Sequence, residues 1–297
     1  MKRFLTKVFI FFIFIIVTDI IVGQYIKQLP NFEVDDRLEK ILEGKINSNI
    51  IITGSSVGAR GILAEKITDE TSFSAYNLSY PGSDITFHEF IIKNYIANNT
   101  VPQKILLTVD EVIFKADRSL KFRLDRCYPL LKYPVIKKIV AHKEQKNKYL
   151  AKYSNLYMFK REMLKGVKKM FSKYDTIWEN GSMPLTFQKK AITQELKQSK
   201  PYSINNELKY KIKAFKNIIS LAKEHNIELV LVFPPQYKII NTSFVSRLKE
   251  VYQGKYVYLD NQTKDFQDKK LFSDKAHLNI KGAELFTKYI INNLELR

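Results

Sequence analysis

Five short apolar runs, separated by segments with helical patterns, constrain the fold of this chain more than any other feature. The first run, residues 49–54, contains three consecutive isoleucines and a glycine stop, which is the pattern of a strand buried on both faces. Alternation of such runs with helices is typical of parallel strands covered on both sides. We therefore predict an α/β three-layer sandwich with a mostly parallel five-stranded sheet. The other runs are 73–78, 104–109, 227–233 and 256–259, and the predicted helices are 59–67, 85–97, 208–225, 243–252 and 280–294.

Residues 115–216 interrupt this alternation. They contain 26 lysines and arginines against 8 acidic residues, so nearly all of the net charge of +19 lies here. We predict a basic, mainly helical insertion within an α/β domain that otherwise spans 49–297. Such a lobe is either a solvated surface or a binding surface for anionic polymers or lipid headgroups. It contains no recognised nucleic-acid-binding module, so nucleic acid is not an expected partner.

Residues 1–23 have the composition of a membrane anchor or signal segment. Three basic residues among the first seven precede an apolar stretch, 8–22, which contains the charged Asp19. The basic flank predicts that the N-terminus stays inside and that the rest of the chain is exported to the periplasm or the outer face of the membrane. No small-x-small cleavage site follows, which favours an uncleaved anchor. Residues 24–48 are expected to form a polar linker.

Asp274 and His277 stand three residues apart just before the last predicted helix. Asp274 can accept the Nδ1 proton of His277, which fixes the tautomer and leaves Nε2 free to take a proton from a nucleophile. Ser56 is a candidate nucleophile because it follows the first strand, at the sheet edge where ligands bind in open α/β folds. Two serines before a helix, Ser55 and Ser56, are equally an ordinary N-cap sequence.

A second turn follows the second predicted strand and contains Gly82. Its position after that strand corresponds to the position of Ser56 after the first strand. Its amide can point to the same place as the amide of Ser56, where the two would bind an oxyanion. A Pro-Gly turn also forms without any function. His88, in the helix that follows, faces the loop after Gly82 and can line a site there, but a place on the helix surface is expected.

The order of these blocks resembles the SGNH (GDSL-like) hydrolase superfamily, over about residues 49–115 and 227–294. The resemblance implies a flavodoxin-like fold, with Ser56 as nucleophile, His277 as base and Asp274 as its orienter. It also implies that the amides of Ser56 and Gly82 bind the oxyanion. The Gly-Ser-Ser block and the Asp-Lys-Ala-His-Leu-Asn ending look like those of the membrane-anchored D-alanyl-transfer and exopolysaccharide O-acetylation branches.

The chain departs from the superfamily after the third strand. Asp110 stands where the third block would supply an asparagine to the oxyanion hole, and a carboxylate cannot donate there. We expect Asp110 to line the substrate pocket with Ser55 and Tyr237. It would bind an acceptor hydroxyl or ammonium there, or else hold a loop through backbone amides.

Together these features predict an exported serine esterase or O-acyltransferase that acts on an anionic or acylated cell-envelope polymer. A membrane-bound acyl-donor protein is a further expected partner of a transferase. The single cysteine, Cys127, and four scattered histidines give no disulfide framework or metal cluster, and no cofactor is expected. Two alternatives remain: a non-catalytic polymer-binding or assembly protein on the same fold and, ranked lower, a lipase at the membrane surface.

Overall fold

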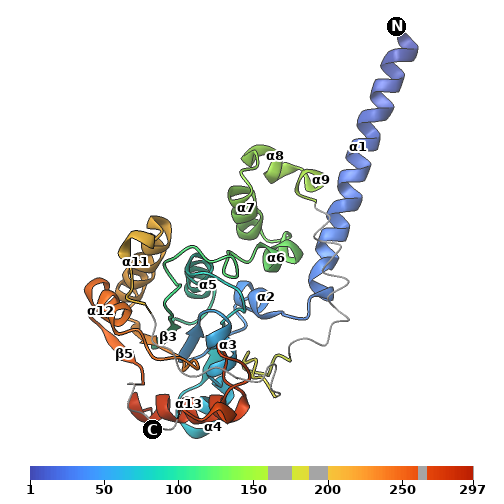
Figure 1. The fold of residues 1–297 in the computed structure, drawn as a ribbon. Helices are drawn as coiled ribbons and strands as arrows, with labels where there is room; N and C mark the ends of the chain where they lie inside the picture. The colour runs from blue at the N-terminus through green and yellow to red at the C-terminus, as the bar shows by residue number, and fades with distance from the viewer. Residues whose placement is uncertain (160–175, 187–199, 260–265, 297) are drawn as a thin grey trace. The chain divides into compact units, whose positions relative to one another are not determined.

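The computed structural model describes residues 1–159, 176–186, 200–259 and 266–296. The chain divides into two compact units. The first unit consists of Met1–Glu39 with Arg123–Tyr174, and the second of Lys40–Phe122 with Asp175–Arg297. The sheet lies in the second unit, and the long N-terminal helix lies in the first (Figure 1).

Within the described residues, five parallel strands form one sheet in the order β2-β1-β3-β4-β5. The strands coincide with the apolar runs, and β1 is buried along its whole length because helices cover both faces. The predicted α/β sandwich with a five-stranded sheet is confirmed, and every strand pair is parallel. The strands are β1 (Ile50–Thr53), β2 (Ala75–Asn77), β3 (Lys104–Thr108), β4 (Glu228–Val232) and β5 (Lys255–Val257).

The strand order reverses between β1 and β3, because the chain steps from β1 to β2 and then crosses back to β3. Right-handed crossovers place the helices after β1 on one face of the sheet and the helix after β2 on the other. Accordingly, α3 and α4 pack against α13, whereas α5 packs against α11 (Figure 1). The helices of this unit are α3 (Ser56–Gly61), α4 (Ala64–Glu70), α5 (Ile85–Asn98), α11 (Lys209–Glu224), α12 (Thr242–Val251) and α13 (Ile280–Asn293).

One predicted helix is broken in two. The pattern over 59–67 predicted a single helix, but α3 ends at Gly61 and α4 begins at Ala64. At the break, the amide of Leu63 donates to Thr287 Oγ1 at 2.9 Å and the amide of Ala64 donates to Ser182 Oγ at 2.8 Å. Both acceptors are far away in the sequence, so the local pattern could not reveal them.

The first unit is built around α1 (Lys2–Gln28), which is exposed along its apolar part and buried only near its end, at Ile26. The helical segment Lys2–Phe32 is long and apolar enough to cross a membrane. Residues 24–48, expected as a linker, contain the end of α1, a 3-10 turn (Leu29–Phe32) and α2 (Arg37–Leu42). Burial of Ile26, Leu29, Leu38 and Ile41 gives these turns their packing.

The basic segment 115–216 contributes to both units. The described residues of this segment in the first unit, 123–159, form short helices. Residues 176–186 belong to the second unit, where the amide of Asn77 in β2 donates to the carbonyl of Asn180 at 2.7 Å. Residues 160–175 and 187–199 lie outside the described residues. The helices of the basic segment in the first unit are α6 (Leu124–Cys127), α7 (Pro134–Lys143), α8 (Lys148–Tyr153) and α9 (Asn155–Met158).

Candidate active site

Ser56 lies at the carboxyl edge of the sheet, where β1 turns sharply into α3. Ser55 is the N-cap residue, and Ser56 opens the helix. The turn is packed tightly against the end of β3: a Cβ added at Gly54 would lie 1.7 Å from Thr108 Oγ1, and one at Gly58 would lie 2.6 Å from the same atom. Glycine is therefore required at both positions, and it lets the serine turn sit directly on the sheet.

His277 and Asp274 form a hydrogen-bonded chain with Ser56. His277 Nε2 lies 2.8 Å from Ser56 Oγ, and His277 Nδ1 lies 2.8 and 3.0 Å from the two carboxylate oxygens of Asp274. Since a carboxylate only accepts, Nδ1 carries the proton, and Nε2 is left to accept the Ser56 hydroxyl proton. The structure thus brings together the serine, histidine and aspartate that the sequence analysis singled out.

Asp274 is held as a carboxylate by the loop that carries it. The amides of Ala276 and His277 donate to its Oδ1 at 2.9 and 3.0 Å. Partial burial by itself would raise the pKa of Asp274, but the His277 ring and these amides outweigh it and hold the pKa below its ordinary value. A charged Asp274 orients the His277 ring and stabilises it when it takes a proton.

The loop from Phe272 to Asn279 is fixed at both ends. The ring of Phe272 is fully buried in the core, and the Asn279 side chain caps α13 by accepting from the amide of Gly282. In the middle, the amide of Tyr237 donates to the carbonyl of Lys275 at 2.8 Å. His277 therefore sits on a loop that is tied to the core, to the last helix and to the segment after β4.

The turn after β2 lies beside the serine turn. Gly82 adopts a φ of 75°, which favours glycine, and its carbonyl accepts from the amide of Lys121 at 3.0 Å. The amide of Tyr80 donates to the carbonyl of Gly54 at 2.9 Å. Among the described residues, neither the Gly82 amide nor the Ser56 amide donates to another group. Both amides are thus available to a ligand oxygen at this edge.

A buried serine and histidine tie the two turns together. Ser83 Oγ lies 3.0 Å from the carbonyl oxygen of Gly54, 2.7 Å from that of Tyr80 and 2.8 Å from His88 Nε2. The two carbonyl oxygens can only accept, so the single hydroxyl proton of Ser83 is donated to them. The hydroxyl oxygen must therefore accept a hydrogen bond from His88, whose Nε2 carries the proton. The link fixes the Gly82 turn against the end of β1.

His88 is only 3% exposed, which contradicts its expected place on the helix surface. The reason is that α5 is buried on more than one side, with Ile85, Phe87, Ile91 and Ile92 all covered. Burial lowers the pKa of His88 to about 4; the nearby Asp84 raises it and Lys211 lowers it further. His88 is therefore neutral near pH 7 and acts as a hydrogen-bond donor in the fold.

Asp110, the residue in place of the superfamily asparagine, follows β3 and caps the turn after it. Its Oδ1 accepts from the amide of Val112 at 3.1 Å. Burial raises the pKa of Asp110 above its ordinary value, while the Val112 amide and Lys238 oppose the shift. Of the expected roles, the loop-holding contact is the one present in this geometry.

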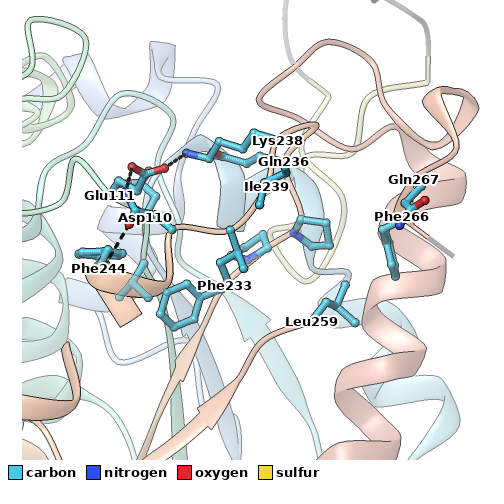
Figure 2. Close-up of a pocket in the computed structure, with 15 residues that line it drawn as sticks. Asp110, Glu111, Phe233, Gln236, Lys238, Ile239, Phe244, Leu259, Phe266 and Gln267 are labelled. Carbon is cyan, nitrogen blue, oxygen red and sulfur yellow. Dashed lines mark hydrogen bonds and ion pairs between the residues drawn. The ribbon is translucent and has the colours of Figure 1, made fainter. Parts of the chain in front are cut away.

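A cavity of about 260 Å³ opens at the same sheet edge, beyond the ends of β3, β4 and β5. Figure 2 shows aromatic and aliphatic side chains around it, with Glu111 paired to Lys238 at 2.7 Å on its rim. Its lining residues are Val109, Asp110, Glu111, Phe233, Pro234, Pro235, Gln236, Lys238, Ile239, Ile240, Asn241, Phe244, Leu259, Phe266 and Gln267.

The three residues expected in a substrate pocket occupy different places. Asp110 lines the large cavity, whereas Ser55 lines a much smaller one with Asp110 and His88. Tyr237 is buried, and its ring packs edge to face on Phe272, 5.5 Å between centroids. Tyr237 thus supports the loop that carries the base.

The structure offers no preformed metal centre within its described residues, where no group of three or more His, Cys, Asp or Glu side chains is gathered. Ser83 and its hydrogen bond to His88 are the part of the site that sequence reasoning missed. The available signal was that Ile85, Ile91 and Ile92 lie one turn from His88 on the same side of the helix.

Comparisons with known proteins find similarity only among solved structures. No family model matches the sequence, and no curated protein sequence matches it. A Bacteroides fragilis protein with a provisional acylhydrolase description aligns with a TM-score of 0.43 and 9% identity, over 90% of this chain and 98% of that one. A Streptococcus pneumoniae protein with a provisional platelet-activating-factor description aligns with a TM-score of 0.42 and 13% identity, over 97% and 98% of the two chains.

Proposed function

We propose that this protein is a serine-dependent acyl esterase or O-acyltransferase, anchored in a membrane and exported, that acts on an acylated cell-envelope polymer. The observation that carries the proposal is the hydrogen-bonded chain from Ser56 through His277 to Asp274. A serine whose hydroxyl is bonded to an oriented histidine is the arrangement that activates a weak nucleophile. The same residues in the same order along the fold underlie the resemblance to SGNH hydrolases.

The chemistry would proceed in two halves. Ser56 Oγ attacks the acyl carbonyl while His277 Nε2 takes the hydroxyl proton, and the amides of Ser56 and Gly82 stabilise the oxyanion. The C–O bond to the leaving alcohol then breaks, and His277 gives that alcohol the proton. In the second half, water or a sugar hydroxyl attacks the acyl-serine with the proton again passing through His277, so that Ser56 is regenerated.

The cavity beyond β3 to β5 supports a binding role for this sheet edge. Its volume of about 260 Å³ suits one sugar ring or a short acyl chain, and Phe233 and Phe244 offer apolar faces to either. Glu111 and Lys238 on its rim can bind polar groups of a polymer. The segment 233–238 joins the cavity to the base, because Tyr237 is bonded to Lys275.

Contacts made by α1 support an anchor that is kept after export. Asp19, Ile26 and Leu29 all take part in the packing or hydrogen bonding of the first unit. A signal peptide removed after residue 22 would take Asp19 and its hydrogen bonds away from that unit. The basic residues at the N-terminal end favour an orientation with the second unit outside the cell membrane.

Labelling with a fluorophosphonate tests the proposed nucleophile. Ser56→Ala should abolish covalent labelling of the full-length protein, because Ser56 supplies the hydroxyl that lies 2.8 Å from His277 Nε2. Ser55→Ala is the matched control, since Ser55 precedes the nucleophile and its side chain makes no capping hydrogen bond. Undiminished labelling of Ser56→Ala would refute the assignment.

Asp110 favours a second candidate, a non-catalytic protein that holds an envelope polymer on the same fold. The residue leaves the oxyanion site with two amides and no side-chain amide, and loss of one such donor costs about 2.7–4 kcal/mol of transition-state stabilisation. Binding of an anionic polymer that weakens steeply with salt, together with no labelling of Ser56, would support this alternative.

A further inference from the structure

The last two described helices of the basic segment in the first unit, α8 and α9, carry large apolar side chains on their exposed face. Tyr153 is 72% exposed, Tyr149 66% and Leu150 53%, whereas Ala151, on the other side of α8, is buried. Such a concentration of aromatic and aliphatic side chains on so short a segment marks a contact surface. We call the α8–α9 surface the set Lys148, Tyr149, Leu150, Lys152, Tyr153 and Leu156.

The α8–α9 surface is tied to the membrane-spanning helix through Asp19. Ser154, the N-cap residue of α9, donates from Oγ to Asp19 Oδ1 at 2.6 Å. The amide of Leu156 donates to the same oxygen at 2.8 Å, and Asn155 Nδ2 donates to Oδ2 at 3.3 Å. One turn further along α1, a Cβ added at Gly23 would lie 2.6 Å from Asn155 Nδ2, so α9 packs closely on α1.

The position of Asp19 along α1 sets the depth of this contact. Asp19 lies sixteen positions after Arg3, which is about 24 Å of helix. The hydrocarbon core of a bilayer is about 30 Å thick, and a long basic side chain such as Arg3 reaches several ångströms toward the headgroups. With Arg3 at the inner boundary and the long side chain of Lys7 extended back toward it, Asp19 lies at the outer boundary. A carboxylate and its polar partners avoid the cost of burial in hydrocarbon there.

The chemistry of the surface fits that depth. Tyrosine rings concentrate at membrane interfaces, where the ring lies among apolar groups and the hydroxyl reaches water. Lys148 and Lys152 lie exposed beside Tyr149 and Tyr153, with each ammonium group over the ring of the tyrosine that follows it, at 5.3 and 5.0 Å. Lysines at this level attract the phosphate groups of anionic lipids.

We propose that the α8–α9 surface lies in the outer headgroup layer of the membrane that α1 crosses, where it binds anionic phospholipids. The inference rests on the proposed membrane anchor, and it adds a second, lateral contact with the bilayer to the single helix. Leu150 and the tyrosine rings enter the boundary of the acyl chains, and the two lysines contact lipid phosphates. The first unit then contacts the membrane both through α1 and through the α8–α9 surface.

Fluorescence in lipid nanodiscs tests the proposal on the full-length protein. An environment-sensitive fluorophore is attached at Tyr153→Cys, since the native Cys127 is buried and unreactive. We expect a blue-shifted emission in discs of phosphatidylcholine with phosphatidylglycerol, quenching by brominated lipid, and a smaller shift in phosphatidylcholine alone. Emission typical of water in both discs, or a protein partner needed for the shift, would overturn the proposal.

Two controls separate the possible failures. Lys148→Gln with Lys152→Gln should reduce the shift in anionic discs, whereas Lys213→Gln with Lys216→Gln, the same loss of charge on the exposed face of α11, should not. Equal effects of the two pairs would overturn the role of the α8–α9 lysines. A fluorophore at Phe14→Cys tests whether α1 lies in the membrane. If brominated lipid quenches the fluorophore at residue 14 but not at residue 153, only the lateral contact is refuted. If it quenches neither, the membrane anchor is refuted as well.

Discussion

The hydroxyl of Ser83 shows how a residue outside the reacting groups can set the geometry of the site. It joins Gly54, which precedes the serine turn, to the Gly82 turn and to His88. In the proposed enzyme these turns supply both oxyanion amides. Ser83 is then a positioning residue, since it acts through the Gly82 backbone.

We predict that Ser83→Ala lowers kcat for ester hydrolysis with little change in KM. Loss of one hydrogen bond is worth about 1 kcal/mol, which is about a fivefold lower kcat if the whole loss falls on the transition state. Ser119→Ala, at an exposed serine, is the control. Steady-state kinetics on a soluble acetyl ester would measure both, and an unchanged kcat for Ser83→Ala would exclude the positioning role.

Asp110 gives a second prediction at this scale, because burial raises its pKa. A carboxyl with a raised folded-state pKa favours folding while it is protonated, and the folded state loses that advantage as pH rises through the folded pKa. Asp110→Asn cannot ionise and keeps an acceptor for the Val112 amide. At pH values above the folded-state pKa of Asp110, we expect Asp110→Asn to melt at a higher temperature than the native protein. The difference should shrink as the pH is lowered toward 4.

At the scale of elements, α13 packs so closely against the loop that carries His277 that an added methyl group would disturb the contact. A Cβ added at Gly282 would lie 2.2 Å from the carbonyl oxygen of Leu271, so the loop that leads to Asp274 would have to move. We predict that Gly282→Ala loses about 1–3 kcal/mol of stability and much of its fluorophosphonate labelling rate. Gly61→Ala should change neither, since its added Cβ meets Pro234 at 3.4 Å. Equal behaviour of the two variants would contradict this account.

Helix α5 gives a prediction about acid stability through His88. An unfolded histidine takes a proton below about pH 6.5, but in the fold His88 does so only near pH 4. The unfolded state therefore binds more protons between these two pH values. As the pH is lowered through this window, the stability of the fold decreases by on the order of 3 kcal/mol. Melting temperatures at pH 7.5 and 4.5 should show a smaller loss for His88→Gln than for the native protein or for His142→Gln, at an exposed histidine.

The elements also show what the sequence could and could not predict. Apolar runs located all five strands, because strands buried on both faces must be apolar throughout. The break between α3 and α4 was not predictable, since Thr287 and Ser182 supply the hydrogen bonds from distant parts of the chain. The burial of His88 was missed for a related reason: it depends on what packs around α5, which helical periodicity alone does not reveal.

At the scale of the whole molecule, the expected linker contains helices, and α1 makes contacts within the first unit. Asp19 accepts from Ser154 and Leu156, and Ile26 is buried. We predict that protein purified from membranes keeps all 297 residues. Intact-mass spectrometry would measure this, and a mass that lacks the first 20 to 25 residues would contradict an uncleaved anchor.

The nucleophile and its base lie 221 residues apart in the chain and meet only when β1 and the last loop have both taken their places. Before the chain has folded, Ser56 is an ordinary alcohol with no histidine beside it. Ester chemistry would therefore begin only after the C-terminal helix has docked, on the side where folding is completed. In the proposed enzyme, the long separation would delay activity until the fold is complete.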